Sequence, residues 1–164
     1  MNLSPTVHLV FVFLHVLGAI LFMGNIIVSA MWMAQAKRTK NTAVLHYASL
    51  SVMRGDRVFT MPGILLIVVP GVLAMGHYGG FGASAPWAEL ALALFILSGI
   101  VWAAILLRLQ RRMISLSGAA VESGGEVDAA FYTTLKSWNM WGGIATLLPF
   151  VSLILMVFKP TLWS

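Results

Sequence analysis

The sequence predicts an all-α protein that crosses a lipid bilayer as an integral membrane four-helix bundle. Hydrophobic residues make up 60% of the chain and charged residues only 9%, whereas a soluble domain has about 25% charged residues. Four stretches also lack Asp, Glu, Lys and Arg, and a bilayer span needs about 20 apolar residues. These stretches are Met1–Ala36, Val58–Ala88, Leu90–Leu107 and Ser137–Phe158. We therefore expect a single transmembrane domain over residues 1–164.

The first predicted helix covers about residues 5–36. Ser4 is a favourable N-cap, and Pro5 suits the first helical position because its fixed φ is already helical. The following segment, about residues 42–57, is half polar. It fits either an amphipathic helix on the membrane surface or an extension of the second membrane helix, and its periodicity does not separate these alternatives.

The second predicted helix, about residues 58–76, contains Pro62 and Pro70. Each proline leaves the carbonyl four residues earlier without its helical partner, here Val58 and Leu66. Inside a membrane such a carbonyl needs a donor from a neighbouring helix or from water. We therefore expect this helix to be kinked and to accept hydrogen bonds from its neighbours.

The third and fourth predicted helices cover about residues 86–112 and 137–158. The polar, glycine-containing stretch Ser117–Asp128 is predicted to form a loop between them. Pro149 interrupts the fourth helix, so the Ala145 carbonyl loses its helical partner and needs another donor.

The basic residues predict which side of the membrane each connection faces. Nine of the ten Lys and Arg residues lie in the first and third connections, and only Lys159 lies on the opposite side. Positive residues accumulate on the cytoplasmic side, so we expect both termini on the non-cytoplasmic side of a bacterial inner membrane. Aromatic belts are expected at Trp32, Trp138 and Trp141 on the cytoplasmic side and at Trp87 and Trp163 on the other.

Composition also excludes several classes of function. The chain has no cysteine, so disulfides, thiolate metal ligands and thiol nucleophiles are ruled out. The sequence contains no phosphate-binding glycine loop, no pair of catalytic carboxylates and no nucleophile triad. The net charge of +5 arises from the loops and reports membrane topology, so we expect a lipid bilayer and no nucleic acid as partner.

A polar stripe on the first helix marks the face expected to point into the bundle. Residues seven apart lie nearly in line on a helix, and His8, His15 and Ser29 share one such line. Gly18 and Asn25 lie on the adjoining line. Polar groups that face lipid are costly, so this face is expected to be buried. Gly18, one turn from His15, is expected to leave space beside the imidazole ring.

His15 is the principal candidate for a functional residue. A buried imidazole can bind haem iron, relay protons or bind another metal. The structural alternative is a hydrogen bond to a carbonyl freed by proline on the second or fourth helix. His8 and His77 are expected near the non-cytoplasmic surface, where they would complete a ligand set with His15 or remain solvated interfacial residues. His46 is expected to be structural.

A haem with two axial ligands needs a second ligand at the depth of His15. The residues expected at that level on the other helices are Pro70, Phe95 and Ser152, none of which is a histidine. Four alternatives remain open. Either His77 reaches inward, or Met75 binds the iron, or the iron is five-coordinate, or no haem is bound.

Arg54 and Arg57 flank Asp56 at the start of the second membrane helix. Arginine pairs well with carboxylates and phosphates, so these two residues are a candidate site for an anion or a haem propionate. The alternative is that both side chains extend to the membrane surface while Asp56 neutralises one of them.

Three segments resemble a widespread bacterial family of predicted integral membrane proteins, domain of unknown function family 2269. They are His15–Gly24, Asp56–Gly63, and Trp141–Gly143 together with Leu155–Pro160. The His-x-x-Gly sequence at His15 and Gly18 also resembles the membrane protoporphyrinogen oxidases, which bind haem b, and the copper-resistance D membrane proteins. In such bundles a histidine on the first helix is the expected functional group, which here implies His15.

The leading hypothesis is a haem b protein of the inner membrane that transfers electrons or carries out porphyrin redox chemistry. His15 would bind the iron, His77 or His8 would be the second ligand, and Gly18 would allow close approach. The alternatives are a non-catalytic scaffold or accessory subunit, and a small oligomeric transporter element. The residues do not decide whether the protein is an enzyme, nor whether it forms a homo-oligomer or has a redox partner.

Overall fold

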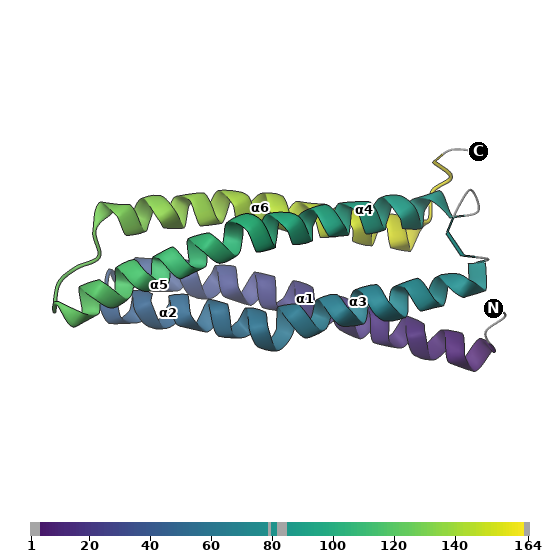
Figure 1. Cartoon of the computed structure of the whole chain (residues 1–164), viewed down its shortest axis with the longest axis horizontal. Helices are drawn as coiled ribbons and strands as arrows, with labels where there is room; N and C mark the ends of the chain where they lie inside the picture. The colour runs from purple at the N-terminus through teal and green to yellow at the C-terminus, as the bar shows by residue number, and fades with distance from the viewer. Residues whose placement is uncertain (1–3, 79, 82–84, 163–164) are drawn as a thin grey trace.

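The computed structural model describes residues 4–78, 80–81 and 85–162. Within these ranges the chain forms four long antiparallel helical rods and no strand, and both chain ends lie at the same end of the bundle (Figure 1). All four rods are long and apolar enough to cross a membrane. The predicted belt residue Trp163 and the loop residues 79 and 82–84 lie outside the described residues.

The first rod is the single helix α1, Pro5–Thr39. Ser4 caps it as predicted, because its hydroxyl accepts a hydrogen bond of 3.4 Å from the Val7 amide. Lys40 ends it with a left-handed backbone, φ 52°, so the chain turns sharply into the second rod.

The second rod is continuous and settles the alternative left open for residues 42–57, which extend the membrane helix. It comprises α2 (Thr42–Gly55), a π-helical turn η1 (Asp56–Thr60), α3 (Met61–Ala74) and a 3₁₀ turn η2 (Met75–Tyr78). The π turn ends at Thr60, two residues before Pro62. Figure 1 shows that the rod bends where α2 meets α3, so the predicted kink is present.

The third rod is longer than predicted. It comprises α4 (Pro86–Val101), a second π-helical turn η3 (Trp102–Leu106) and α5 (Leu107–Glu122). The predicted loop from Ser117 was therefore wrong in its first half. Met113, Ser117 and Ala120 are buried on one face of α5, and the Ser117 hydroxyl is satisfied within the helix by the Met113 carbonyl at 2.7 Å. Burial of one face of the helix therefore outweighs the tendency of these polar and glycine residues to form a loop.

The fourth rod is α6, Ala129–Phe158, which begins eight residues before the predicted start. Asp128 begins it, since its carboxylate accepts a 3.1 Å hydrogen bond from the Phe131 amide. The prediction for Pro149 is confirmed on the neighbouring rod, where the Ser98 hydroxyl donates to the freed Ala145 carbonyl at 2.6 Å.

The rods pack as two antiparallel pairs. In the first pair α1 lies against α2 and α3, and in the second α6 lies against α4 and α5. The close backbone contact between the pairs joins α2 to α5, near the end that carries the α1–α2 and α5–α6 connections and the basic residues. We call this the basic end, and the opposite end the terminal end. Toward the terminal end the pairs diverge (Figure 1).

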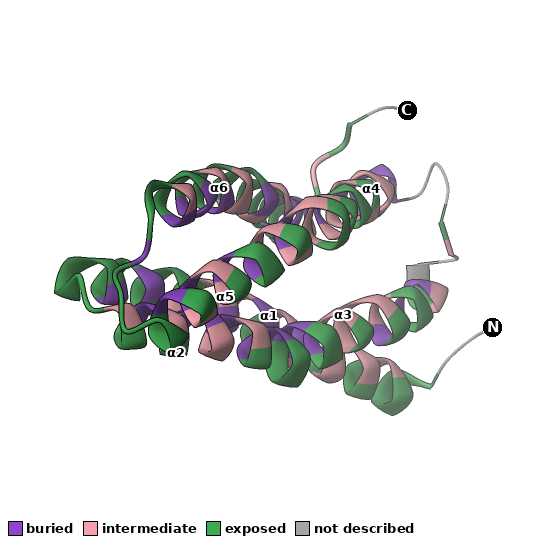
Figure 2. Ribbon diagram, turned by 60° about the vertical axis from the view of Figure 1, so that its left-hand side comes forward, coloured by how far each residue is buried: buried purple, intermediate pink, exposed green. Residues whose placement is uncertain are grey.

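A smaller hydrophobic cluster around Met75, Trp87 and Ala88 lies at the terminal end, and the larger one lies at the basic end, where all four rods meet. Its fully buried members include Met33, Leu45, Val52, Met113, Phe131 and Leu135. Exposed residues cover the outward helix faces (Figure 2), and many of them are large and apolar, as lipid contact requires. Examples are Leu9, Phe13, Ile20, Leu65, Leu147 and Val157. Trp138 and Trp87 are buried, so these two do not face lipid, and their depth near the membrane boundaries stays a prediction.

Glycine allows α1 to approach the second rod closely. A Cβ atom at Gly18 would lie 2.7 Å from the Leu66 Cβ and 2.8 Å from the Ile67 amide nitrogen. Small residues at a membrane helix interface permit such backbone contact. The space expected beside Gly18 is therefore occupied by α3. The His15 ring is accommodated by Gly71 instead, where a Cβ would lie 2.6 Å from the ring Nδ1 atom.

Candidate functional site

His15 is oriented by a hydrogen bond to the second rod. Its Nδ1 atom lies 2.7 Å from the Ile67 carbonyl oxygen. A carbonyl can only accept, so Nδ1 carries the hydrogen and Nε2 of the neutral ring carries the lone pair. His15 thus hydrogen-bonds a carbonyl of the second rod, as the structural alternative required, but the acceptor is Ile67 and not the Leu66 carbonyl that Pro70 frees. The same bond leaves Nε2 available as a ligand.

His15 lines a cavity of about 620 Å³ between the two helix pairs at the terminal end, which we call the histidine cavity. Its walls are mostly apolar and come from α1, α3, α4 and α6. The functional side chains among its lining residues are His8, His15, Met75, Trp87 and Lys159. The Lys159 ammonium lies over the Trp87 ring, 5.4 Å from the ring centroid.

The two other candidate histidines lie against each other. The rings of His8 and His77 stack with centroids 4.3 Å apart and planes inclined by 25°. They do not join His15, because no three His, Cys, Asp or Glu residues in the described part of the chain are grouped to hold a metal ion. The expected three-histidine ligand set is therefore not formed. Met75, by contrast, is buried and lines the histidine cavity.

The arginines beside the second membrane helix lie on the surface. Arg54 and Arg57 are both exposed, and neither lines the histidine cavity. The Arg57 guanidinium contacts the Met53 sulfur at 3.7 Å. Asp56 does not neutralise either of them, because its carboxylate turns into the bundle, where its described partners are all uncharged.

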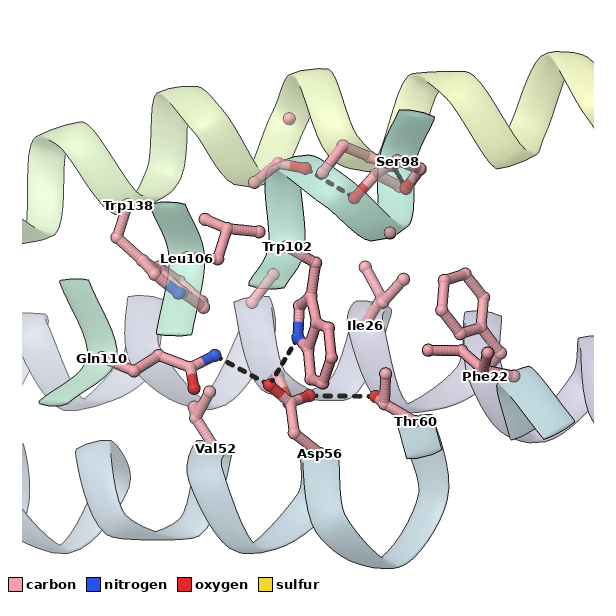
Figure 3. Close-up of a pocket in the computed structure, with 18 of the residues that line it drawn as sticks. Phe22, Ile26, Val52, Asp56, Thr60, Ser98, Trp102, Leu106, Gln110 and Trp138 are labelled. Atoms are coloured by element: carbon pink, nitrogen blue, oxygen red, sulfur yellow. Dashed lines mark hydrogen bonds between the residues drawn. The ribbon is translucent and has the colours of Figure 1, made fainter. Parts of the chain in front are cut away.

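Asp56 is the buried polar centre that sequence reasoning missed as a site. Its Oδ1 atom accepts hydrogen bonds from Asn25 at 3.0 Å and from Thr60 at 2.9 Å. Its Oδ2 atom accepts from Trp102 at 3.1 Å and from Gln110 at 2.8 Å (Figure 3). Asn25 also donates to the Thr60 hydroxyl at 2.9 Å. Four donors on two oxygens are complementary to an ionised carboxylate.

The two π-helical turns position this network. Asp56 is the first residue of η1 and Trp102 the first residue of η3, and π-helical turns frequently occur at functional sites. Gly55 leaves room for Asn25, since a Cβ there would lie 2.5 Å from the Asn25 oxygen. The sequence carried one signal for this site. Asp56 lies just before a charge-free stretch, and isolated polar residues occur within three of the apolar rods.

A second cavity, of about 510 Å³, adjoins this network and is called the aspartate cavity. Its polar lining includes Asp56, Gln110, Ser29 and Trp138. Phe22 and Phe95 line both cavities, and their rings are tilted with centroids 5.3 Å apart. These two aromatic rings therefore lie where the histidine cavity and the aspartate cavity meet.

His46 lies apart from both cavities and has a structural contact. Its Nδ1 atom lies 2.9 Å from the Ser117 hydroxyl on α5. Gly118 leaves room for the ring, because a Cβ there would lie 3.3 Å from its Cε1 atom. His46 thus helps to join α2 to α5, as a structural residue would.

Comparison with known families identifies the chain. Residues 9–160 match the family described as predicted integral membrane protein, DUF2269. The chain belongs to this family. The match covers all four rods, so the chain is an integral membrane protein in which four helices are long and apolar enough to span a bilayer. No curated protein and no solved structure matches it. The resemblance to the oxidase and copper-resistance families is not seen in these comparisons.

Proposed function

We propose that this DUF2269 protein binds haem b in the histidine cavity, where Nε2 of His15 would hold the iron. The observation that carries the proposal is the 2.7 Å hydrogen bond from Nδ1 to the Ile67 carbonyl. Metal-bound histidines nearly always donate their second ring N–H to a carbonyl, a carboxylate or water. That bond fixes both the tautomer and the ring orientation, so His15 is prepared to bind iron.

The surroundings of His15 suit a porphyrin. The histidine cavity is large and mostly apolar, as a macrocycle that must be shielded from water requires. Lys159 at its wall supplies a cation for a propionate, and the second ligand would come from Met75, His8 or His77. Arg54 and Arg57, being exposed at the basic end, would serve a propionate only of a second haem. When bound, the haem would supply one-electron transfer, and the chain would orient it and exclude water.

The membrane setting follows from the charge distribution. We infer a bacterial inner membrane with the basic end in the cytoplasm and both termini on the opposite side. The histidine cavity would then lie in the non-cytoplasmic half of the bilayer. A redox partner would approach from that side, and the reaction would be electron transfer or porphyrin redox chemistry.

An absorption spectrum of the purified protein, oxidised and reduced, tests the proposal directly. With haem supplied during expression, we expect a Soret band, b-type bands and about one haem per chain. His15→Ala should lose the haem, whereas His46→Ala, a matched histidine change outside the cavity, should retain it. In His15→Gly, added imidazole should restore the spectrum, which separates ligation from folding. Wild-type protein without colour, or His15→Ala with full haem occupancy, would refute the assignment.

A transport element is the second candidate, favoured by the two cavities that meet at Phe22 and Phe95. A colourless protein that carries a solute into liposomes would support this reading instead. Substitution of His15 or Asn25 should then change the flux.

A further inference from the structure

Three buried polar atoms at the aspartate cavity have no hydrogen-bond partner among the residues that the structure describes. They are the hydroxyl oxygen of Ser29, the side-chain oxygen of Gln110 and the indole nitrogen of Trp138. The three residues are only 3%, 2% and 8% exposed. Leaving such groups unpaired is costly, above all within a membrane, and here three of them from three helices line one cavity.

The hydrogen-bonding role of each atom is determined by its chemistry. The Gln110 amide nitrogen donates to Asp56, so the amide cannot be reversed and its oxygen is an acceptor. The Trp138 indole nitrogen can only donate, and the Ser29 hydroxyl can do both. Figure 3 shows Gln110 of α5 and Trp138 of α6 pointing into the same space between the rods. The lining of this one cavity therefore includes a donor, an acceptor and a hydroxyl.

The rest of the cavity indicates an uncharged, largely apolar ligand. Most of its walls are aliphatic or aromatic, including Phe22, Phe95 and Trp102. Asp56 would repel an anion. It also offers little to a cation, because each of its oxygens already accepts two hydrogen bonds. Aromatic rings favour a flat aromatic partner.

We propose that the aspartate cavity binds an apolar molecule that carries a phenolic hydroxyl group, such as a phenol or a hydroquinone. The ligand's hydroxyl oxygen accepts a hydrogen bond from the Trp138 indole N–H. The same hydroxyl group donates a hydrogen bond to the side-chain oxygen of Gln110. Ser29 completes the polar contact, and the aromatic walls hold the ring. This site does not depend on haem in the histidine cavity, since none of its three polar contacts lines that cavity.

Binding of 4-heptylphenol by the full-length protein in detergent tests the site, with 4-heptylanisole as the probe that lacks the hydroxyl proton. Neither compound is redox-active, so a bound haem would not complicate the calorimetric titration. We expect saturable binding of the phenol at one site per chain. The anisole should bind about tenfold more weakly, because it cannot donate to Gln110.

Ser29→Ala removes only a hydroxyl without a described partner, so a purely structural role predicts no loss of stability from it. Trp138→Phe also shortens a buried ring, so its binding is compared at equal folded fraction. Trp138→Phe deletes the indole N–H and Ser29→Ala the hydroxyl, and each should weaken phenol binding about five- to tenfold. Trp141→Phe, on the same helix but outside the cavity, should bind normally. If Trp138→Phe does not fold, Ser29→Ala carries the test. Equal uptake of phenol and anisole, or unchanged binding in a folded variant, would show that water satisfies these atoms and would overturn the proposal.

Discussion

At the scale of single residues, the decisive feature is the carboxylate of Asp56. An ionisable side chain inside a membrane protein needs compensation for the hydration it loses. Here the compensation is four hydrogen bonds from uncharged donors on α1, η1, η3 and α5. Two of those donors, Trp102 and Gln110, belong to the other helix pair. Asp56 therefore joins the two pairs near the point where they begin to diverge.

Replacing Asp56 by Asn should destabilise the protein, although the two side chains are nearly equal in size. The amide has one acceptor oxygen instead of two, so the two donors on one side lose their partner, at a cost of about 2–4 kcal/mol. The thermal unfolding midpoint, followed by circular dichroism in detergent, should fall by roughly 4–15 °C. Glu126→Gln, an exposed carboxylate in the connection before α6, is the matched control and should leave the midpoint unchanged. An equal midpoint for both variants would contradict the role assigned to Asp56.

At the scale of the elements, close contact between α1 and α3 positions His15. Membrane helices gain little from hydrophobic burial against each other, so small residues and tight backbone packing drive their association. Gly18 and Gly63 face one another, and a Cβ at Gly63 would lie 3.1 Å from the Gly18 carbonyl oxygen. This contact sets the distance at which His15 reaches the Ile67 carbonyl.

Gly18→Ala should force α1 away from α3. The new methyl group would meet the Leu66 side chain and the α3 backbone within 3 Å, and overpacking of this kind costs about 1–3 kcal/mol. The expected result is a lower unfolding midpoint and, if haem is bound, a changed spectrum, because His15 moves with α1. Gly24→Ala on the same helix is the control, since a Cβ there meets nothing within 4 Å. Gly24→Ala should be neutral or slightly stabilising, and equal effects at both positions would refute the packing argument.

At the scale of the whole molecule, the two helix pairs are held together at the basic end and separated at the terminal end. The apolar cluster at the basic end includes Leu45, Met113 and Phe131, which close the bundle there. The two cavities lie between the pairs, the aspartate cavity beside the packed core and the histidine cavity nearer the terminal end. The molecule thus combines a packed half that provides stability with a divergent half that offers space for ligands.

The orientation in the membrane is testable because the native chain contains no cysteine. Single cysteines at Gly125, in the connection between α5 and α6, and at Thr161, beyond α6, would report the two ends; both positions are exposed. We expect a membrane-impermeant maleimide to label Thr161→Cys in intact spheroplasts. Gly125→Cys should react only after permeabilisation. The reverse pattern would place the basic end outside.

Much of the fold was predictable because it depends on composition and on local rules. Charge-free stretches located the four spans, and caps such as Ser4 depend on neighbouring residues alone. The partner needed by Ala145 also followed from Pro149, although the sequence did not name Ser98 as the donor. The start of α6 and the end of α5 were missed, because tertiary burial there outweighed the local polarity.

The candidate sites were predictable only in part. His15 stood out because a polar stripe on an otherwise apolar helix must face protein, and the structure places it at the wall of a cavity. Asp56 was mistaken for a surface charge, since two arginines flank it in the sequence and only the rotation of the second rod separates them in space.

The sequence by itself determined that this is a four-helix membrane protein with its basic residues at one end, because hydropathy and charge act on each segment independently of its neighbours. The tertiary structure alone decided that His15 presents Nε2 to a cavity, that Gly18 packs against α3, and that Asp56 accepts hydrogen bonds from both helix pairs. Those features require residues far apart in the chain to meet. Such contacts depend on how the helices rotate and approach one another, which no local pattern specifies.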